Sequence, residues 1–201
     1  GISASVDEAE FTQAIDRIRD YIRAGDTYQV NYTYRLRFDA YGTPFALYAR
    51  LRKRQPVPYG ALIALPVGGA VLSLSPELFV RHNAGELVTR PMKGTAPASG
   101  DAAQDTLRGA ELAADPKNRA ENLMIVDLLR NDLGRVCETG SVNVPALFEV
   151  TRSGSVLQMT STVRGTLRAN SSLADIFGAI YPCGSITGAP KRRTMEIITE
   201  V

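Results

Sequence analysis

The sequence predicts an α+β fold in which antiparallel strands form the sheets and helices flank them. Phe11, Ile15, Ile18 and Ile22 are spaced four, three and four residues apart, which is typical of a helix with one apolar face. Short apolar stretches follow at close intervals between turn residues, and this spacing favours antiparallel hairpins. The 201 residues, 44% of them apolar, suffice to bury a sizeable core in one domain or at most two.

Composition excludes several classes of protein. The 23 Lys and Arg residues nearly balance the 21 Asp and Glu residues, so the net charge of +2 provides no broad face for a nucleic-acid backbone. Cys137 and Cys183 match neither metal-ligand spacing nor a disulfide scaffold, and we expect reduced core thiols in a cytoplasmic protein. Residues 1–11 hold three acids and no basic apolar segment, so we expect no signal peptide.

The first half of the chain contains the clearest periodic patterns. The helix that includes the first apolar stripe is expected to end at Gly25. From Tyr28 to Phe38 apolar residues alternate with polar ones, which predicts a strand with one polar face. Residues 55–76 carry no charge, but Pro66 and two glycines interrupt them, so a membrane span is not expected. We expect strands instead, at 60–65, 70–75, 77–82 and 86–90.

Helices and strands are also predicted in the second half. Asp101 caps a helix that runs to about Ala114, and a second helix runs from Pro116 to about Leu133, with Gly134 as a left-handed terminator. Apolar residues on nearly every side of the second helix indicate that it is buried. The later elements are strands at 141–150 and 155–167 and helices at 172–181 and from Pro190 onward. Because the last helical pattern continues to Val201, we expect an incomplete domain.

Two of the candidate catalytic residues follow predicted strands. Lys93 lies between an X-Pro turn and Gly94, an arrangement that fixes the backbone and can direct the amine into a cleft as a nucleophile. Glu77 follows Ser75-Pro76, and a carboxyl group desolvated there could act as a general acid. The alternatives are a solvated loop lysine and a glutamate at the edge of a strand.

Two further candidates belong to helix starts. Glu121, in the first turn of an otherwise apolar helix, is costly to bury unpaired, so a cation is a plausible partner. Its alternative role is stabilisation by the helix N-terminus. Asp127 and Arg130 are expected to pair structurally. The segment Gly184–Lys191 contains glycines and hydroxyl side chains just before a helix N-terminus, a position where a carboxylate or phosphate can bind. The alternative is a turn that only caps the helix. The only histidine, His82, is assigned no role.

Taken together and in order, these segments resemble the chorismate-utilising enzymes, the family that includes anthranilate synthase component I, isochorismate synthase, salicylate synthase and aminodeoxychorismate synthase component I. The resemblance covers nearly the whole chain and implies an anthranilate-synthase-like fold, an antiparallel β-sandwich flanked by helices. The matching segments are Ala24–Asn31, Ser75-Pro76-Glu77, Pro91–Thr95, Asn118–Gly134, Leu157–Ser161 and Gly184–Lys191.

Within this family, Lys93 resembles the nucleophile of the aminodeoxychorismate synthases, because anthranilate and isochorismate synthases have alanine there. Gln29 stands where the water-adding members have a lysine base, so an ammonia-using member is implied. The resemblance then implies amination of chorismate to 4-amino-4-deoxychorismate on the folate (para-aminobenzoate) route. Lys93 would attack C2 while Glu77 protonates the leaving C4 hydroxyl. A glutamine amidotransferase subunit or domain would supply the ammonia.

The resemblance also implies binding residues. Mg²⁺ would neutralise the ring carboxylate of chorismate, with Glu121 as one ligand. Backbone donors of the Gly184–Gly188 segment would hold a substrate carboxylate. The residues expected to bind substrate are Gln29, Thr95, Gln158, Gly184, Ser185, Thr187, Gly188 and Lys191.

The chain departs from the family pattern at two positions. Histidine is frequent in the family where Gln158 stands, and an acidic residue is common at Asn118. The final family segment, with its other metal carboxylates, and the amino-terminal subdomain are also expected to be absent, so residues 1–201 would be an incomplete catalytic domain. The alternatives are anthranilate synthase component I and a noncatalytic fragment or scaffold that binds chorismate.

Overall fold

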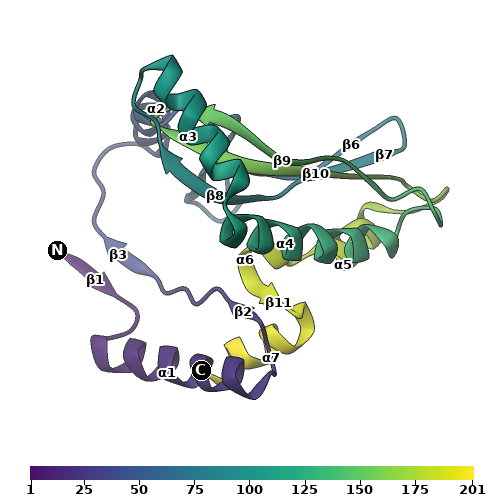
Figure 1. The fold of residues 1–201 in the computed structure, drawn as a ribbon. Helices are drawn as coiled ribbons and strands as arrows, with labels where there is room; N and C mark the ends of the chain where they lie inside the picture. Colours follow the sequence, from purple (N-terminus) through teal and green to yellow (C-terminus); the bar gives the residue numbers. More distant parts are fainter. The chain divides into compact units, whose positions relative to one another are not determined.

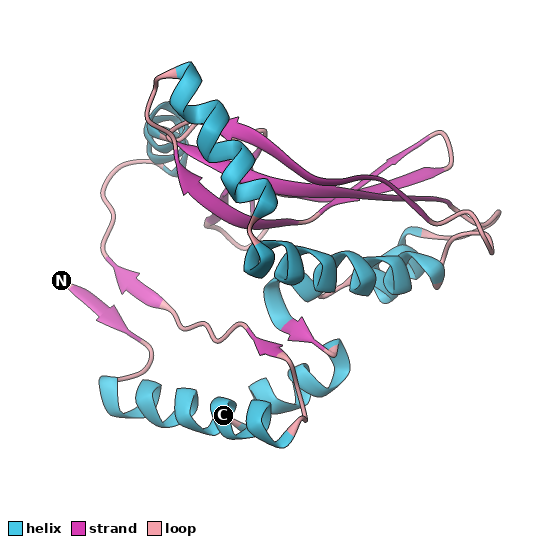
Figure 2. Ribbon diagram, viewed as in Figure 1, coloured by secondary structure: helices cyan, strands magenta, loops and turns pink.

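The computed structural model describes all residues from 1 to 201, and the chain divides into two units. The larger unit is Gly42–Ala179, and the smaller unit combines Gly1–Tyr41 with Ile180–Val201. Both units contain helices and antiparallel strand pairs (Figure 1, Figure 2), so the predicted α+β class is confirmed.

A five-stranded antiparallel sheet forms the main part of the larger unit. Strand β9 pairs with one edge of β10, while β8 and then β7 pair with the other edge. The row formed by β7 and β8 is interrupted at Pro91, which has no backbone N–H. Its carbonyl oxygen still accepts a hydrogen bond of 3.1 Å from the Ser161 N–H. The strands are β6 (Leu78–Asn83), β7 (Glu86–Arg90), β8 (Met92–Pro97), β9 (Asn143–Ser153) and β10 (Val156–Thr166).

Two helices pack against this sheet, α3 (Ala102–Ala114) and α4 (Pro116–Gly134). Asp101 and Pro116 occupy their starts as predicted, and the Asp101 side chain accepts a hydrogen bond of 2.9 Å from the Gln104 N–H. Leu112 of α3 packs with Leu157 and Met159 of β10 in a buried apolar cluster. This packing places both helices against the strands that carry the candidate site.

Helix α4 corrects two predictions. Its buried residues form a single stripe at spacings of three and four, so one face is buried rather than nearly every side. Gly134 belongs to the helix and does not adopt a positive φ. The Arg168 guanidinium instead donates hydrogen bonds to the carbonyls of Gly134 and Arg135, which satisfies the C-terminal carbonyls without a left-handed residue. The stripe consists of Asn122, Ile125, Val126, Leu129, Asp132 and Leu133.

The rest of the larger unit contains a hairpin and two helices. The predicted hairpin is confirmed as β4 (Tyr59–Ala64) and β5 (Ala70–Ser75). Helix α2 (Pro44–Arg54) precedes it, was not predicted, and is capped by the Thr43 side chain. Helix α5 (Leu173–Ile180) follows β10 in the predicted region. None of the helices has the length and apolar character that crossing a membrane requires.

In the smaller unit, α1 (Glu8–Ala24) has the predicted end, since Gly25 has a φ of 82°. The strand predicted from Tyr28 to Phe38 is reduced to its ends, β2 (Gln29–Val30) and β3 (Leu36–Phe38). These ends pair with β11 (Gly188–Ala189) and β1 (Ile2–Ala4), respectively. Residues 31–35 pair with no strand, which explains why alternation alone overestimated this element. The remaining helices are α6 (Gly184–Thr187) and α7 (Lys191–Glu200).

Candidate functional site

Lys93 lies on a β-bulge of strand β8, not in the turn that its sequence context predicted. Gln158 of β10 pairs with Thr95 and Thr160 pairs with Met92, so Met159 alone faces both Lys93 and Gly94. A bulge of two residues against one bends the strand and changes the direction of its side chains. The ladder therefore continues past Lys93 while the lysine itself is outside regular pairing.

Gly94 provides the backbone conformation that this bulge needs. Its φ of 97° is one that residues with a side chain rarely adopt. A Cβ at this position would lie only 3.2 Å from the Cβ of Asn118, near the start of α4. The bulge thus lies against the helix at a distance that a side chain would make tighter than most Cβ contacts.

Glu77 occupies the turn between β5 and β6. The Ser75 hydroxyl accepts a hydrogen bond of 3.2 Å from the Glu77 N–H and donates one of 3.1 Å to the Glu77 carbonyl. Leu78, the next residue, pairs with Arg90 of β7. The Glu77 carboxyl group therefore belongs to a hydrogen-bonded turn next to β7. Strand β8, which carries Lys93, continues from β7 along the same edge of β10.

A cavity of about 260 Å³ lies beside these two candidates in the larger unit. Pro76 and Leu78, on either side of Glu77 in the chain, both contribute to its wall, as does Met92, which precedes Lys93. Glu77 and Lys93 themselves are not among the lining residues. The polar part of the wall includes Tyr59, Arg90, Thr151, Arg152, Gln158 and Thr160.

Two polar atoms of this cavity wall are buried without a hydrogen-bond partner. They are Nε of Arg90 and Oε1 of Gln158. Gln158 was predicted to bind substrate, whereas Arg90 was not predicted at all. An arginine at the end of a strand resembles any surface arginine in sequence, and only the cavity distinguishes it.

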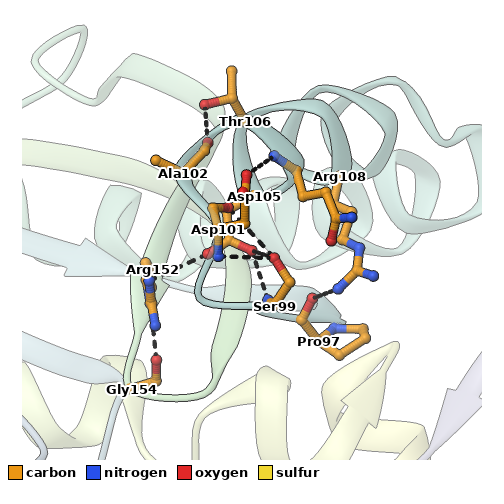
Figure 3. A network of polar contacts seen from close by, with 10 residues as sticks. Pro97, Ser99, Asp101, Ala102, Asp105, Thr106, Arg108, Arg152 and Gly154 are labelled. Carbon is orange, nitrogen blue, oxygen red and sulfur yellow. Dashed lines mark hydrogen bonds and ion pairs between the residues drawn. The ribbon is translucent and has the colours of Figure 1, made fainter.

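Arg152 is held in place by a network that joins α3 to the β9–β10 hairpin (Figure 3). Its Nη1 lies 3.2 Å from Oδ2 of Asp105, and its Nε donates a hydrogen bond of 3.1 Å to the Gly154 carbonyl. Asp105 also accepts hydrogen bonds from the Ser99 N–H at 2.7 Å and the Ser99 hydroxyl at 2.9 Å. The Ser99 N–H is the main reason that the pKa of the Asp105 carboxyl is lowered from its usual value.

Glu121, the predicted metal ligand, lies in the second turn of α4, which begins at Pro116, not in the first. Its side chain is 43% exposed, and its Oε1 lies 4.0 Å from Nζ of Lys117, so the expected cost of burial does not arise. No group of three or more His, Cys, Asp or Glu side chains could hold a metal ion. Glu121 therefore offers one carboxylate, and its role as a Mg²⁺ ligand stays a prediction. The predicted pair of Asp127 and Arg130 forms at 3.0 Å.

The glycine-rich segment of the smaller unit packs against the predicted residue Gln29. The pairs Gln29–Ala189 and Val30–Gly188 join β2 to β11. Gly188 has a φ of 145°, and a Cβ there would overlap the Gln29 carbonyl oxygen. Close approach of two backbones thus requires this glycine.

Part of the donor set expected in this segment is already used within α6. The N–H groups of Ile186 and Thr187 donate to the Cys183 carbonyl, as does the Thr187 hydroxyl. The Ser185 hydroxyl lies 3.2 Å from the Cys183 sulfur. Gly184 begins α6, and Lys191 begins α7 directly after Pro190. The Thr187 hydroxyl and these two amides thus already donate to a carbonyl, and the anion-binding role of the segment stays a prediction.

Both cysteines are buried and form no disulfide, as predicted. Burial raises the pKa of the Cys137 thiol, so its sulfur remains protonated near neutral pH. His82 is exposed on β6.

The whole chain matches one family of known proteins. The family model is described as chorismate binding enzyme and matches residues 1–201. Aminodeoxychorismate synthase component 1 of Klebsiella aerogenes is 46% identical over 198 residues, which are 98% of this chain and 44% of that protein. Anthranilate synthase component 1 of Streptomyces coelicolor is 43% identical over 201 residues, which are 100% of this chain and 39% of that protein.

A solved structure shows the same fold. Anthranilate synthase component I from Streptococcus pneumoniae matches with a TM-score of 0.88 at 32% identity. The match covers 100% of this chain and 44% of that chain. The sequence therefore spans less than half the length of the proteins that it resembles.

Proposed function

Because the chain belongs to the family of chorismate binding enzymes, we propose that the protein converts chorismate to 4-amino-4-deoxychorismate, an amination on the para-aminobenzoate and folate route. The observation that most supports this reaction is the place of Lys93, on a bulge beside a cavity and three residues after Arg90. The relatives include proteins named for this reaction and proteins named for anthranilate synthesis. The lysine at position 93 supports the first of these two reactions.

The proposed reaction uses Lys93 and Glu77 in two displacements. The Lys93 amine forms a bond to C2 of chorismate, both ring double bonds shift, and the C4 hydroxyl leaves as water with a proton from Glu77. Ammonia then forms a bond to C4, both double bonds shift back, and the C2–nitrogen bond to lysine breaks. The new ammonium group at C4 returns a proton to Glu77. Covalent catalysis replaces one difficult displacement by two easier ones. The net change is the exchange of a hydroxyl group for an amino group.

The same proposal includes the source of the ammonia, the metal ion and the cellular compartment. A glutamine amidotransferase subunit or domain supplies the ammonia, which fits the words "component 1" in the names of several relatives. Mg²⁺ assists when bound, with Glu121 as one of several ligands. The substrate-binding roles of Gln29, Thr95, Gln158 and the Gly184–Lys191 segment also stay proposals. Two buried thiols outside any disulfide fit a reducing compartment such as the cytoplasm.

Product identity tests the proposed function. The longest form of the protein that the gene encodes is incubated with chorismate, Mg²⁺ and ammonium at mildly alkaline pH, and the products are separated by chromatography. We expect 4-amino-4-deoxychorismate as the main product. Anthranilate or isochorismate would contradict the proposal in favour of another family reaction. Binding of chorismate with no turnover would favour the noncatalytic scaffold instead.

A further inference from the structure

Two amide side chains of the smaller unit form a short hydrogen-bonded chain. Nε2 of Gln29 donates a hydrogen bond of 3.3 Å to Oδ1 of Asn31, and Nδ2 of Asn31 donates one of 3.3 Å to the Ser185 carbonyl. Residues two apart in extended backbone share a face, which lets the two amides meet. Asn31 thus joins the predicted binding residue Gln29 to helix α6.

The Ser185 carbonyl determines the orientation of both amides. A carbonyl oxygen can only accept a hydrogen bond, so the Asn31 amide turns its NH2 group toward Ser185 and its oxygen toward Gln29. That oxygen also only accepts, so the Gln29 amide points its nitrogen at Asn31. Oε1 of Gln29 is then the end of the chain that is left to accept a hydrogen bond from a reactant.

The backbone that carries the two amides is held in place by the glycine-rich segment. Val30 pairs with Gly188, and the Asn31 N–H donates a hydrogen bond of 2.8 Å to the Thr187 carbonyl. The Gln29 carbonyl lies so close to Gly188 that a Cβ there would overlap it. Because β2 is fixed beside β11 (Figure 1), the direction of the Gln29 amide depends on its side-chain torsions and on the contact with Asn31.

We propose, on the basis of the proposed function, that Asn31 is a positioning residue that presents Oε1 of Gln29 to a hydrogen-bond donor of a reactant. Without Asn31 the Gln29 amide can turn either end outward, and its NH2 end does not accept a hydrogen bond. Two reactants of the proposed reaction carry a donor: ammonia, whose lone pair stays free for attack while one N–H donates, and chorismate with its C4 hydroxyl. The C4 hydroxyl has left before ammonia adds, so kinetics distinguish the two.

Steady-state kinetics with ammonium test the inference on the longest form of the protein that the gene encodes. N31L removes both side-chain hydrogen bonds at similar volume, and we expect it to lower one kcat/KM by about threefold to tenfold, the loss of one hydrogen bond. If ammonia is the bound donor, kcat/KM for ammonium falls at saturating chorismate. If the C4 hydroxyl is the donor, kcat/KM for chorismate falls instead. N31D keeps an acceptor for Nε2 of Gln29 and should stay within about twofold of the parent, because Asn31 is half-buried and water can donate to the Ser185 carbonyl.

A double-mutant cycle separates positioning from a merely structural role. In a Q29L background, N31L should cause no further loss, because Asn31 acts through Gln29. The control T12V removes a hydroxyl that donates a hydrogen bond of 2.8 Å to the Glu8 carbonyl on α1 of the same unit, and it should react like the parent. Should N31L fail to fold by circular dichroism, N31A takes its place in both backgrounds, because it also removes both hydrogen bonds and adds no apolar side chain.

The outcomes separate this inference from the proposed function. If the parent aminates chorismate while N31L matches it in both kcat/KM values, Asn31 does not position Gln29 and the inference is wrong, although the function stands. A loss by N31L that is equally large in the Q29L background, or a loss by N31D as large as that of N31L, also overturns the inference. A parent that does not aminate chorismate overturns the proposed function and the inference together.

Discussion

Lys93, the proposed nucleophile, lies outside regular strand pairing. The bulge leaves Met92 and Thr95 to hold the ladder on either side of it. The lysine can therefore be exchanged with little consequence for the sheet. The position of the Lys93 side chain therefore does not depend on the hydrogen bonds between the strands. This suits a nucleophile, because the groups around a nucleophile determine its reactivity.

We expect K93A to abolish formation of 4-amino-4-deoxychorismate, or to divert the reaction toward the product of alanine-containing relatives. The unfolding free energy should change by no more than about 0.5 kcal/mol, as for a surface substitution. Product chromatography and urea unfolding measure the two effects. Intact-protein mass spectrometry after chorismate treatment should also show an adduct on Lys93 in the parent. Full amination by K93A, with no adduct in the parent, would contradict the nucleophilic role.

Asp105 is expected to make the unfolding free energy depend on pH in the acidic range. Because its folded pKa is lowered, its contribution is complete above the unfolded value of about 3.9 and is lost as pH falls through the folded value. D105N should therefore be less stable than the parent at pH 7, and this difference should shrink toward pH 3. Urea unfolding at several pH values measures it. In the control D127N, which changes an exposed pair on α4, the difference from the parent should stay within about 0.5 kcal/mol. An equal D105N deficit at both pH values would contradict the assignment.

At the scale of elements, the bulge in β8 depends on Gly94. We expect G94A to destabilise the larger unit by about 1–3 kcal/mol, because alanine is strained at a φ of 97° and its Cβ would crowd Asn118. G109A in α3 is the matched control. Its Cβ would meet only Val150, at an ordinary 3.6 Å, and alanine should stabilise the helix by about 0.5–1 kcal/mol. Thermal unfolding of both variants measures these opposite effects. Equal stability of G94A and the parent would show that the bulge tolerates a side chain.

The elements that could be predicted from sequence are those whose pattern is local. Helix α1 shows its own stripe and its own terminating glycine, and the β4–β5 hairpin has its own turn. Strand β8 could not be predicted, because residues Met92–Pro97 show no alternation and become a strand only along the edge of β10. The opposite error occurred at residues 31–35, where alternation was present but no partner strand was. The presence or absence of a partner strand thus determined whether each segment forms a strand.

The candidate site was predictable to the extent that its residues belong to motifs. Lys93, Glu77 and Gln158 could be chosen from their neighbours in the chain. Arg90 could not, because residues from separate strands, Leu78 of β6 and Gln158 of β10, line the same cavity as Arg90 only in the folded sheet.

At the scale of the whole molecule, the proposed Mg²⁺ site has one predicted ligand among residues 1–201. Glu121 is one carboxylate, and no cluster of three ligands accompanies it. In the longest form of the protein that the gene encodes, we expect E121Q to raise the Kd for Mg²⁺ while the fold is kept, since the change removes charge at constant size. Calorimetric titration with Mg²⁺ measures this effect. D127N on the same helix is the control and should bind like the parent. If E121Q binds Mg²⁺ equally well, Glu121 has only a structural role.

The interruption at Pro91 has a consequence for how this protein can diversify. Because β7 and β8 share one edge of β10 but are separate ladders, a change in β8 need not propagate into β7. Lys93 and Arg90 then lie on separate ladders. We expect exchange of the side chain at position 93 to leave the pairing of Arg90 with Leu78 unchanged. A protein built this way can change the side chain beside its cavity by a single codon change while the neighbouring ladder keeps its register.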